Sequence, residues 1–283
     1  MIDQRVASNN ISQILSHLAC PQCHKELKWI DSFLICNSCG TFYPMVNEIP
    51  DLRLPSSSEK VELFTWSKHW SENNQQSLSQ KFFSVYRKTV FARTVRYFVD
   101  RYFPSSGVFL EAGSGTSETS MRIDKRGGAR LLVAIDIVLP ILSMCHPIMD
   151  VKVCGDVFHL PFQKNSIDGI WNVGVMEHFN HRQIDQIMRE FHRVLRKDGQ
   201  VILLWPAIDS IPQKMLHIAE KAINLKRREE RFHFHPEEIS QLRSTEEGHD
   251  VLERNGFHTL HIDNGFRSLM AFKTLIGAKN ESN

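Results

Sequence analysis

Two Cys-x-x-Cys pairs near the start of the chain constrain its folding more than any other sequence feature. Twelve residues separate the pairs, and the four cysteines are Cys20, Cys23, Cys36 and Cys39. In a reducing compartment this spacing is typical of a metal site rather than of two disulfides. Four thiolates suit tetrahedral zinc, so we predict a zinc ribbon. A redox pair and a chance arrangement are the alternatives.

The residues around these pairs favour short strands. Residues 27–30 and 33–35 predict a β-hairpin, residues 41–46 a further strand, and residues 11–18 a short leading helix. A unit of this size buries little apolar surface by itself, so a bound metal would replace the missing core. A structural role is therefore favoured over nucleic-acid binding or the docking of a partner.

Composition places the rest of the chain among ordinary globular proteins. The chain has 283 residues and is 42% hydrophobic, which is enough for one large domain beside a small one. Its 34 basic and 32 acidic residues give a net charge of +2, which argues against a nucleic-acid binder that relies on bulk charge. The apolar runs are too short to span a bilayer and no signal-peptide pattern opens the chain, so we expect a cytoplasmic protein.

From residue 108 onward, short apolar runs alternate with helical stretches. Five of these runs have the length and composition of buried strands, at 108–110, 131–135, 151–154, 168–171 and 201–205. This repeating order predicts a parallel α/β sheet. Residues 258–263 and 266–275 are expected to close the sheet as an antiparallel pair.

The same pattern divides the chain into three parts. Residues 1–55 are expected to form the ribbon with its leading helix, and residues 56–104 a linker and the first helices of the second domain. Residues 105–283 are expected to form the large domain. A charged helical insert at about 207–250 interrupts its strand and helix alternation.

A glycine-containing loop directly follows the first predicted strand of the large domain. It contains Glu111, Gly113, Ser114 and Gly115. A dinucleotide fingerprint would need a third glycine where Glu118 stands, and a P-loop would need a Gly-Lys-Ser/Thr sequence, which is missing. The acid that precedes the glycines suits a cationic ligand with an amino group better than a phosphate.

Polar side chains also stand at the ends of the next three strands. Asp136 is placed to accept hydrogen bonds from two ribose hydroxyls, and Asp156 from the exocyclic amine of adenine. Ile137 and Val157 follow these acids and would flank the faces of the adenine. Asn172 ends the fourth strand. Because the carboxyl ends of parallel strands meet at one edge of the sheet, these residues predict a single cofactor site there.

Residues 108–205 resemble class I S-adenosylmethionine-dependent methyltransferases of the broad group called type 11. The resemblance rests on the segments VFLEAGSGTSETS, LLVAIDIV, VCGDVFHLPFQKNSIDGIWNVGVMEHF and EFHRVLRKDGQVILLWPA. It implies a Rossmann-like seven-stranded sheet, mostly parallel with an antiparallel closing pair, and S-adenosylmethionine as cofactor. In that family the Glu-x-Gly-x-Gly loop wraps the methionine part of the cofactor, a role that would fall here to Glu111, Gly113 and Gly115.

The resemblance also assigns the other strand ends. Asp136 matches the ribose-binding acid, Asp156 matches the acid that contacts adenine, and Asn172 lies where the family approaches the methionyl group. One departure is Ser117, which stands where many members have a third glycine. Because serine is small, we expect only modest retuning of the loop.

The first 55 residues resemble a second family, the zinc-ribbon domain of the small activator that partners tRNA and protein methyltransferases. The matching segments are LACPQCHKELKW and FLICNSCGTFYPMVNEIPDL. In the free-standing activator the ribbon helps to stabilise a separate enzyme. Its fusion to the large domain here suggests an intramolecular support role.

Methyl transfer needs alignment more than a fixed set of catalytic groups, because the sulfonium methyl is already electrophilic. His178 is the candidate base, since it follows the fourth strand closely, and Glu177 would orient it or the substrate. The alternative is that His178 packs against the following helix. His233 and His235 would line a substrate pocket or bind a metal with one more ligand, and an exposed loop is the favoured alternative.

We therefore expect an enzyme that methylates a small molecule or a glycan- or lipid-linked acceptor. Arg227, Arg228 and Arg231 in the insert favour an anionic acceptor, with a solvated helix face as the alternative. An RNA methyltransferase is the second hypothesis, because some rRNA guanine methyltransferases also begin with a zinc ribbon. The near-neutral charge and the missing Asn-Pro-Pro-Tyr motif argue against it. A non-catalytic scaffold is the third hypothesis, and the intact strand-end acids argue against that.

Overall fold

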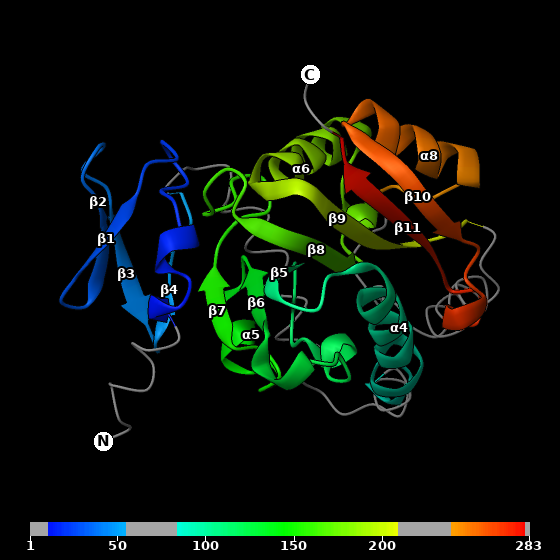
Figure 1. Cartoon of the computed structure of the whole chain (residues 1–283), viewed down its shortest axis with the longest axis horizontal. Helices are drawn as coiled ribbons and strands as arrows, with labels where there is room; N and C mark the ends of the chain where they lie inside the picture. Colours follow the sequence, from blue (N-terminus) through cyan, green and yellow to red (C-terminus); the bar gives the residue numbers. More distant parts are fainter. Residues whose placement is uncertain (1–10, 55–83, 209–238, 281–283) are drawn as a thin grey trace, which may run out of the picture.

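The computed structural model describes residues 11–54, 84–208 and 239–280 of the chain. Within these ranges two sheets lie side by side, and the smaller one stands next to strand β7 of the larger (Figure 1). The centre of the predicted charged insert, with the arginines and histidines that the sequence singled out there, lies outside the described residues. No helix within the described ranges is both long enough and apolar enough to cross a membrane.

The ribbon is a four-stranded antiparallel sheet with the strand order β1-β2-β3-β4. Its strands are β1 Leu27–Ile30, β2 Phe33–Cys36, β3 Phe42–Val46 and β4 Ile49–Pro50. The hairpin expected from the sequence is confirmed, and Asp31 takes a φ of 51° at its turn. The 3-10 turn η1, Leu15–His17, precedes the ribbon where a short helix was expected.

The large sheet has seven strands in the order β10-β11-β9-β8-β5-β6-β7. The strands are β5 Gly107–Ala112, β6 Arg130–Asp136, β7 Val151–Cys154, β8 Ile167–Val173, β9 Leu195–Pro206, β10 Phe257–Asp263 and β11 Phe272–Lys279. All pairings from β7 to β9 are parallel, whereas β11 runs antiparallel to both β9 and β10. This mostly parallel, Rossmann-like sheet with an antiparallel closing pair is the expected architecture.

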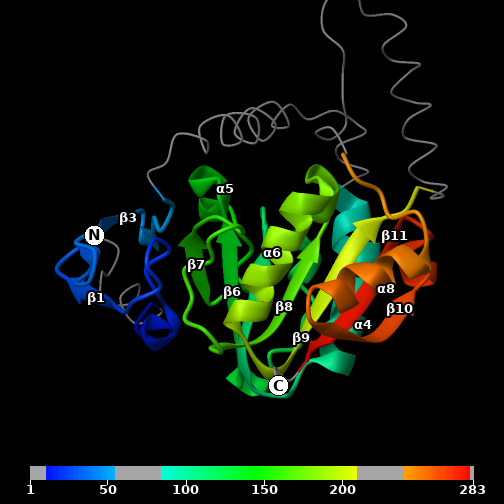
Figure 2. The same cartoon turned by 90° about the horizontal axis from the view of Figure 1, so that it is seen from above.

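Helices cover both faces of the sheet (Figure 2). They are α4 Ala92–Tyr102, α5 Leu139–Ser143, α6 His181–Val194 and α8 Thr245–Arg254. The apolar faces of α6 and α8 pack into one hydrophobic core, and those of α4 and α5 pack into the other. Helix α6 starts sharply because Asn180 and Gln183 form a reciprocal capping box.

The alternation of strands and helices is less regular than the sequence indicates. The β5–β6 connection carries only the 3-10 turns η3 Glu118–Ser120 and η4 Arg126–Gly128. Strand β9 begins six residues before its apolar run, because Leu195 pairs with Ile167 through an irregular register. Strand β11 begins at Phe272 rather than at residue 266. Residues 266–268 instead form the 3-10 turn η6, Phe266–Ser268, which reverses the chain. The Ser268 hydroxyl accepts a hydrogen bond from the Phe272 amide at 3.0 Å.

The ribbon is joined to the large sheet through backbone and apolar contacts. Asp51 forms a parallel bridge with Cys154 at the end of β7, and the Leu52 amide donates to the Cys154 carbonyl at 2.7 Å. Ile49 belongs to the core beneath α4 and α5, whereas Leu52 belongs to the core beneath α6 and α8. The end of the ribbon therefore packs on both faces of the sheet. The predicted domain division at residue 55 stays a prediction.

Candidate cofactor and metal sites

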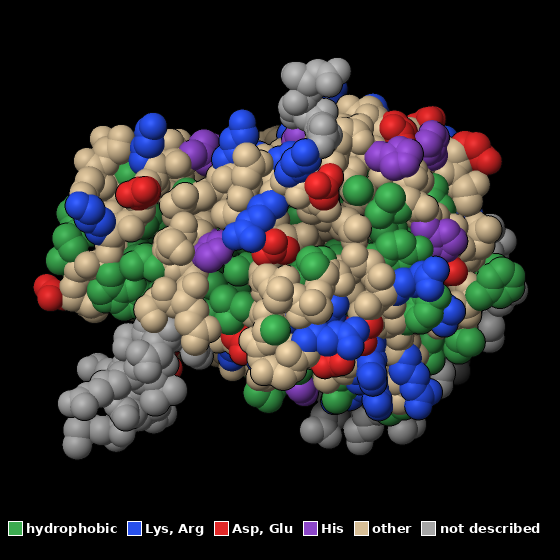
Figure 3. Space-filling model, in the orientation of Figure 1, with side chains coloured by type: hydrophobic (Ala, Val, Ile, Leu, Met, Phe, Trp, Pro, Cys, Tyr) green, Lys and Arg blue, Asp and Glu red, His purple; other side chains and the backbone are tan. Residues whose placement is uncertain are grey.

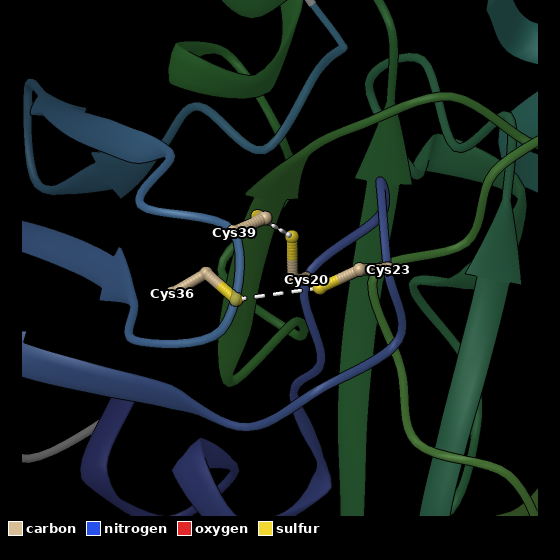
Figure 4. Close-up of side chains that lie close together, drawn as sticks. All are labelled: Cys20, Cys23, Cys36 and Cys39. Atoms are coloured by element: carbon tan, nitrogen blue, oxygen red, sulfur yellow. Dashed lines mark hydrogen bonds between the residues drawn. The ribbon is translucent and has the colours of Figure 1, made fainter.

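The four ribbon cysteines converge on one point. Their sulfur atoms all lie within 4.8 Å of one another, with 3.6 Å between Cys20 and Cys39 and 3.4 Å between Cys23 and Cys36 (Figure 4). Tetrahedral zinc with Zn–S bonds of about 2.3 Å places its sulfurs about 3.8 Å apart, so the cluster fits such an ion. The sequence prediction of a four-thiolate site is therefore matched by the geometry.

Tight turns present the two cysteine pairs. The His24 amide donates to the Cys20 carbonyl at 2.7 Å, and the Gly40 amide donates to the Cys36 carbonyl at 2.8 Å. His24 and Gly40 both have positive φ, at 57° and 75°. Each turn leaves its two sulfurs pointing to the same side.

Neighbouring hydroxyls support the sulfurs, and the sequence did not reveal them. The Tyr43 hydroxyl lies 3.1 Å from the Cys20 sulfur, and the Thr41 hydroxyl lies 3.1 Å from the Cys39 sulfur. Tyr43 is almost fully buried, at 2% exposure. Both hydroxyls can donate to a metal-bound thiolate, which fixes the direction of the ligand. Tyr43 lies on β3 and Thr41 directly precedes that strand, but no local sequence pattern showed which cysteine each hydroxyl would reach.

The second site lies at the carboxyl ends of the parallel strands. Strand β5, which carries Glu111, lies between β6, which ends at Asp136, and β8, which carries Asn172. Asp156 follows β7. All four polar side chains are buried, at 8% exposure or less. Buried carboxyl groups are costly to desolvate, which indicates that this edge is built for a ligand.

The glycine loop is folded tightly over the end of β6. The amides of Gly113 and Ser114 both donate to the Ile135 carbonyl, at 2.9 and 3.0 Å. Gly113 has a φ of 69°, and a Cβ atom there would lie 2.7 Å from the Val175 side chain. The position therefore requires glycine for its conformation and for its close approach to the β8 loop.

Ser117 shows how the loop accommodates the missing third glycine. It takes a φ of 52° and is fully buried, and its hydroxyl accepts from the Cys145 thiol at 3.1 Å. Glycine adopts this left-handed conformation without the Cβ penalty that serine incurs. The serine thus keeps the backbone path and adds one polar contact.

Glu111 presents one satisfied and one unsatisfied carboxylate oxygen. Its Oε1 atom accepts from the Ser120 hydroxyl at 2.7 Å, and Ser120 in turn accepts from the Trp171 indole nitrogen at 3.0 Å. Its Oε2 atom is buried without a hydrogen-bond partner. Burial raises the pKa of Glu111 to about 7, against the lowering effect of the Ser120 bond. A ligand with an ammonium group would satisfy the free oxygen.

Sequence reasoning missed Arg87, which precedes α4 in the π-helical turn η2, Arg87–Phe91. Burial lowers the pKa of Arg87, while the nearby carboxylates of Glu118 and Glu111 act in the opposite direction. A π turn is often associated with function. Here it brings a guanidinium to the glycine-loop end of the site. No sequence pattern marked this residue, because Arg87 is one of several basic residues in an amphipathic stretch.

Asp136 faces the same side of the sheet as Glu111. Its Oδ2 atom accepts from the Gly115 amide at 2.8 Å, and its Oδ1 atom accepts from the Val138 amide at 2.9 Å. Burial raises the pKa of Asp136, although both of these amides lower it. A carboxylate has further lone pairs, so Asp136 can still accept from two vicinal hydroxyls.

Asp156 is held at the neighbouring strand end. Its Oδ1 atom accepts from the Phe158 amide at 2.9 Å, which turns the chain after β7. Ile137 and Val157 follow the two acids directly and are half-buried. The ends of β6 and β7 therefore each carry a buried acid followed by a half-buried apolar residue, and their role as an adenosine pocket stays a prediction.

Asn172 is placed differently from Glu111. Trp171 is in register with Glu111 and packs in the core beneath α4 and α5. Because side chains alternate along a strand, Asn172 points to the opposite face of the sheet. It is fully buried, and neither its amide nitrogen nor its amide oxygen has a hydrogen-bond partner. The two residues therefore do not form one contiguous ligand surface within the sheet.

Glu177 and His178 lie in the 3-10 turn η5, Met176–His178, just beyond β8. The His178 Nε2 atom is 3.8 Å from the Glu177 Oε1 atom. The amides of Ile239 and Ser240 donate to the Glu177 carbonyl at 2.6 and 2.9 Å. These bonds fasten the chain that returns from the insert against the turn.

The comparisons with known proteins agree with this fold. Residues 110–203 match the family model described as a methyltransferase domain of the type-11 group. The biotin biosynthesis bifunctional protein BioHC of Cellvibrio japonicus is 32% identical over 97 residues, which cover 33% of this chain and 18% of that protein. A putative methyltransferase of Encephalitozoon cuniculi is 29% identical over 123 residues, which cover 43% of this chain and 55% of that protein. The chain thus spans about half or less of these relatives.

A solved structure has the same fold over most of the chain. The 1,6-didemethyltoxoflavin-N1-methyltransferase of Burkholderia thailandensis, solved with its substrate and S-adenosylhomocysteine, has a TM-score of 0.53 and 15% identity. The similarity covers 90% of this chain and all of that one, and it concerns the fold. Together these findings show that residues 110–203 are similar to methyltransferase domains and that the chain shares the fold of a solved methyltransferase. In this chain the domain follows a ribbon with a four-cysteine cluster.

Proposed function

We propose that the protein is an S-adenosylmethionine-dependent methyltransferase with a structural zinc ion in its ribbon. The observation that carries the proposal is the unsatisfied, buried Glu111 oxygen on the same sheet face as Asp136. An ammonium group at one end of the site and ribose hydroxyls at the other match this pair of acids. The match of residues 110–203 to the methyltransferase family supports it.

The proposed cofactor contacts follow the order of the strand ends. The methionine end would be held by Glu111, Gly113, Ser114 and Gly115, and the adenosine end by Asp136, Ile137, Asp156 and Val157. We add Arg87 to the methionine end, because its guanidinium can pair with the carboxylate of that group. The four thiolates of the ribbon suit a reducing compartment such as the cytoplasm.

S-adenosylmethionine, when bound, supplies an electrophilic methyl group. The work of this chain is then to hold the acceptor in line with that methyl and to exclude water. We propose that His178 takes the proton of the acceptor and that Glu177 orients the imidazole, since their side chains are only 10% and 5% exposed and lie 3.8 Å apart.

For the acceptor we propose a small molecule or a glycan- or lipid-linked group, with an anionic character. One observation favours RNA as a second candidate. An open groove of about 540 Å³ runs along α4 and is lined by Arg93, Arg96, Tyr97, Asp100, Arg101 and Arg122. Lysine and arginine side chains gather on this part of the surface (Figure 3). Such a groove could follow a phosphate backbone.

The proposal is tested by calorimetry with S-adenosylmethionine and S-adenosylhomocysteine, followed by transfer of a labelled methyl group. We expect both ligands to bind at micromolar concentration. Absence of binding at millimolar ligand would refute the enzyme hypothesis. Label that enters a small-molecule or glycolipid fraction supports the first acceptor class, and label that enters purified RNA replaces it with the second.

We predict that S-adenosylhomocysteine binding weakens as the pH falls through 7. The ligand ammonium needs the Glu111 carboxylate, whose pKa is about 7 in the free protein. Below that pH the dissociation constant should rise by up to tenfold per pH unit. Calorimetry between pH 5.5 and 8.5 measures this, and Glu111→Gln should bind weakly with no step near 7. A flat wild-type profile would remove Glu111 from the ligand contacts.

Protonation of Glu111 has the opposite effect on the stability of the free protein. The folded-state pKa of Glu111, about 7, exceeds the ordinary glutamate value of 4.5, so the folded chain binds an extra proton between these two pH values. The contribution of this proton to the free energy of unfolding is fully present below pH 4.5 and is lost as the pH rises through 7. Glu111→Gln should therefore be more stable than the wild type at pH 8.

The proton-acceptor role of His178 is tested by His178→Gln. We expect turnover to fall about 100-fold, within the range of general-base contributions, while the affinity for S-adenosylhomocysteine stays within twofold. The pH profile of the residual activity should lose its acidic limb. Turnover close to that of the wild type would show that His178 only packs against α6.

A further inference from the structure

The ribbon reaches the large domain at a point next to the proposed adenosine pocket. Its last described residues run beside the end of β7, where Asp51 bridges to Cys154 (Figure 1). The turn that follows β6, with Asp136 and Ile137, lies beside the same strand end, because Asp136 is in register with Cys154. Residues far apart in the sequence therefore meet at this corner of the sheet.

Arg53 connects the end of the ribbon to the turn that follows β6. Its Nη1 atom donates to the Ile137 carbonyl at 3.3 Å, across 84 positions of sequence. Asp51 holds the same guanidinium through two bonds, at 2.8 Å from Nε and 2.6 Å from Nη2. A bidentate pair fixes the plane of an arginine side chain, so the Nη1 group that reaches Ile137 is held in one direction.

Ile137 occupies a sensitive position in the proposed pocket. It lies between Asp136 and Val138, whose amide closes a bond of 2.9 Å onto the Asp136 carboxylate. The Gly155 amide also donates to the Asp136 carbonyl at 3.0 Å. The orientation of this turn decides where the Asp136 carboxylate points and where the Ile137 side chain lies.

We propose that Arg53, aimed by Asp51, is a positioning residue for the adenosine half of the cofactor. The inference rests on the proposed function. Its physical basis is that the ribbon donates a hydrogen bond into the turn carrying the ribose-binding acid, which narrows the range of conformations of that turn before the cofactor arrives. The ribbon would then contribute to ligand affinity as well as to stability.

The test compares two ligands in calorimetry. S-adenosylhomocysteine carries both an adenosine and an amino-acid end, whereas 5′-methylthioadenosine lacks the amino-acid end. For Arg53→Met we expect both affinities to fall by the same factor, about 5- to 20-fold, as for a typical coupling between sites. Glu111→Gln should instead weaken only S-adenosylhomocysteine. Lys28→Met, which removes an exposed cation from β1, is the matched control and should leave both affinities unchanged.

A role in ribbon attachment alone would give a different result. Arg53→Met would then lower the thermal midpoint of the free protein without changing either affinity, and that outcome overturns the inference. If Arg53→Met does not fold, Asp51→Asn provides a second variant, because it removes the carboxylate that holds the Arg53 guanidinium. If Arg53→Met does fold, adding Asp51→Asn to it should have no further effect on either affinity. If the wild type binds neither ligand, the proposed function fails instead.

Discussion

Replacing Cys20 with serine is expected to abolish metal binding and to lower the thermal midpoint of the whole protein by about 10 °C or more. Cys20 is fully buried and its sulfur lies within the four-thiolate cluster. Structural zinc stabilises small ribbons by about 10–16 kcal/mol in isolation, and a serine hydroxyl is a poor ligand for it. Because the ribbon shares its apolar core with the sheet, part of this loss reaches the large domain.

The measurement is differential scanning calorimetry together with zinc analysis after purification in reductant. Cys145→Ala is the matched control, since Cys145 is buried but lies outside the cluster. It should keep one equivalent of zinc and lose only the stability of a small packing defect, about 1 kcal/mol. A Cys20→Ser protein with a full equivalent of zinc would contradict the proposed site, as would wild-type protein with less than about half an equivalent.

Replacing Asp136 with alanine is expected to weaken S-adenosylhomocysteine binding by about 100-fold or more while the protein remains folded. The carboxylate would lose two charge-assisted bonds to the ribose, each worth about 1.5–3 kcal/mol. The substitution would also leave the amides of Gly115 and Val138 without their acceptor, which loosens the glycine loop and the turn after β6. Calorimetry with S-adenosylhomocysteine measures the change.

Asp150→Ala is the matched control for this prediction. Asp150 precedes β7, accepts from the Leu132 amide at 2.9 Å and pairs with Lys125. It thus stabilises a backbone turn much as Asp136 does, but it lies away from the carboxyl ends of the strands. Asp150→Ala should lower the midpoint without changing ligand affinity. If Asp136→Ala bound as tightly as Asp150→Ala, Asp136 would not be a ribose contact.

The local parts of the fold could be predicted from the sequence. The cysteine spacing predicted the four-cysteine cluster, because two short turns fix where four sulfurs point. Strand ends could be found because buried strands are short apolar runs, and the residues after them necessarily share an edge. Asp136 and Ile137 were placed in this way.

Long-range and conformational features were missed for a physical reason. The contact between Arg53 and Ile137 depends on how the ribbon sits against β7, and no local pattern encodes that arrangement. Arg87 was missed because a π turn has no reliable sequence signal. Asn172 was assigned to the same surface as Glu111, but Trp171 is in register with Glu111, so the next residue, Asn172, faces the opposite side of the sheet. The sequence does not encode that register.

The parallel bridge between Asp51 and Cys154 has a consequence for solubility. Strand β7 is at the end of the seven-stranded sheet, and an uncovered end strand offers free amides and carbonyls to another chain. The ribbon covers part of this strand, because the Leu52 amide donates a hydrogen bond to the Cys154 carbonyl. A chain that loses its metal would expose an aggregation-prone edge. Metal supply would then limit how much protein stays in solution, in addition to how stable each molecule is.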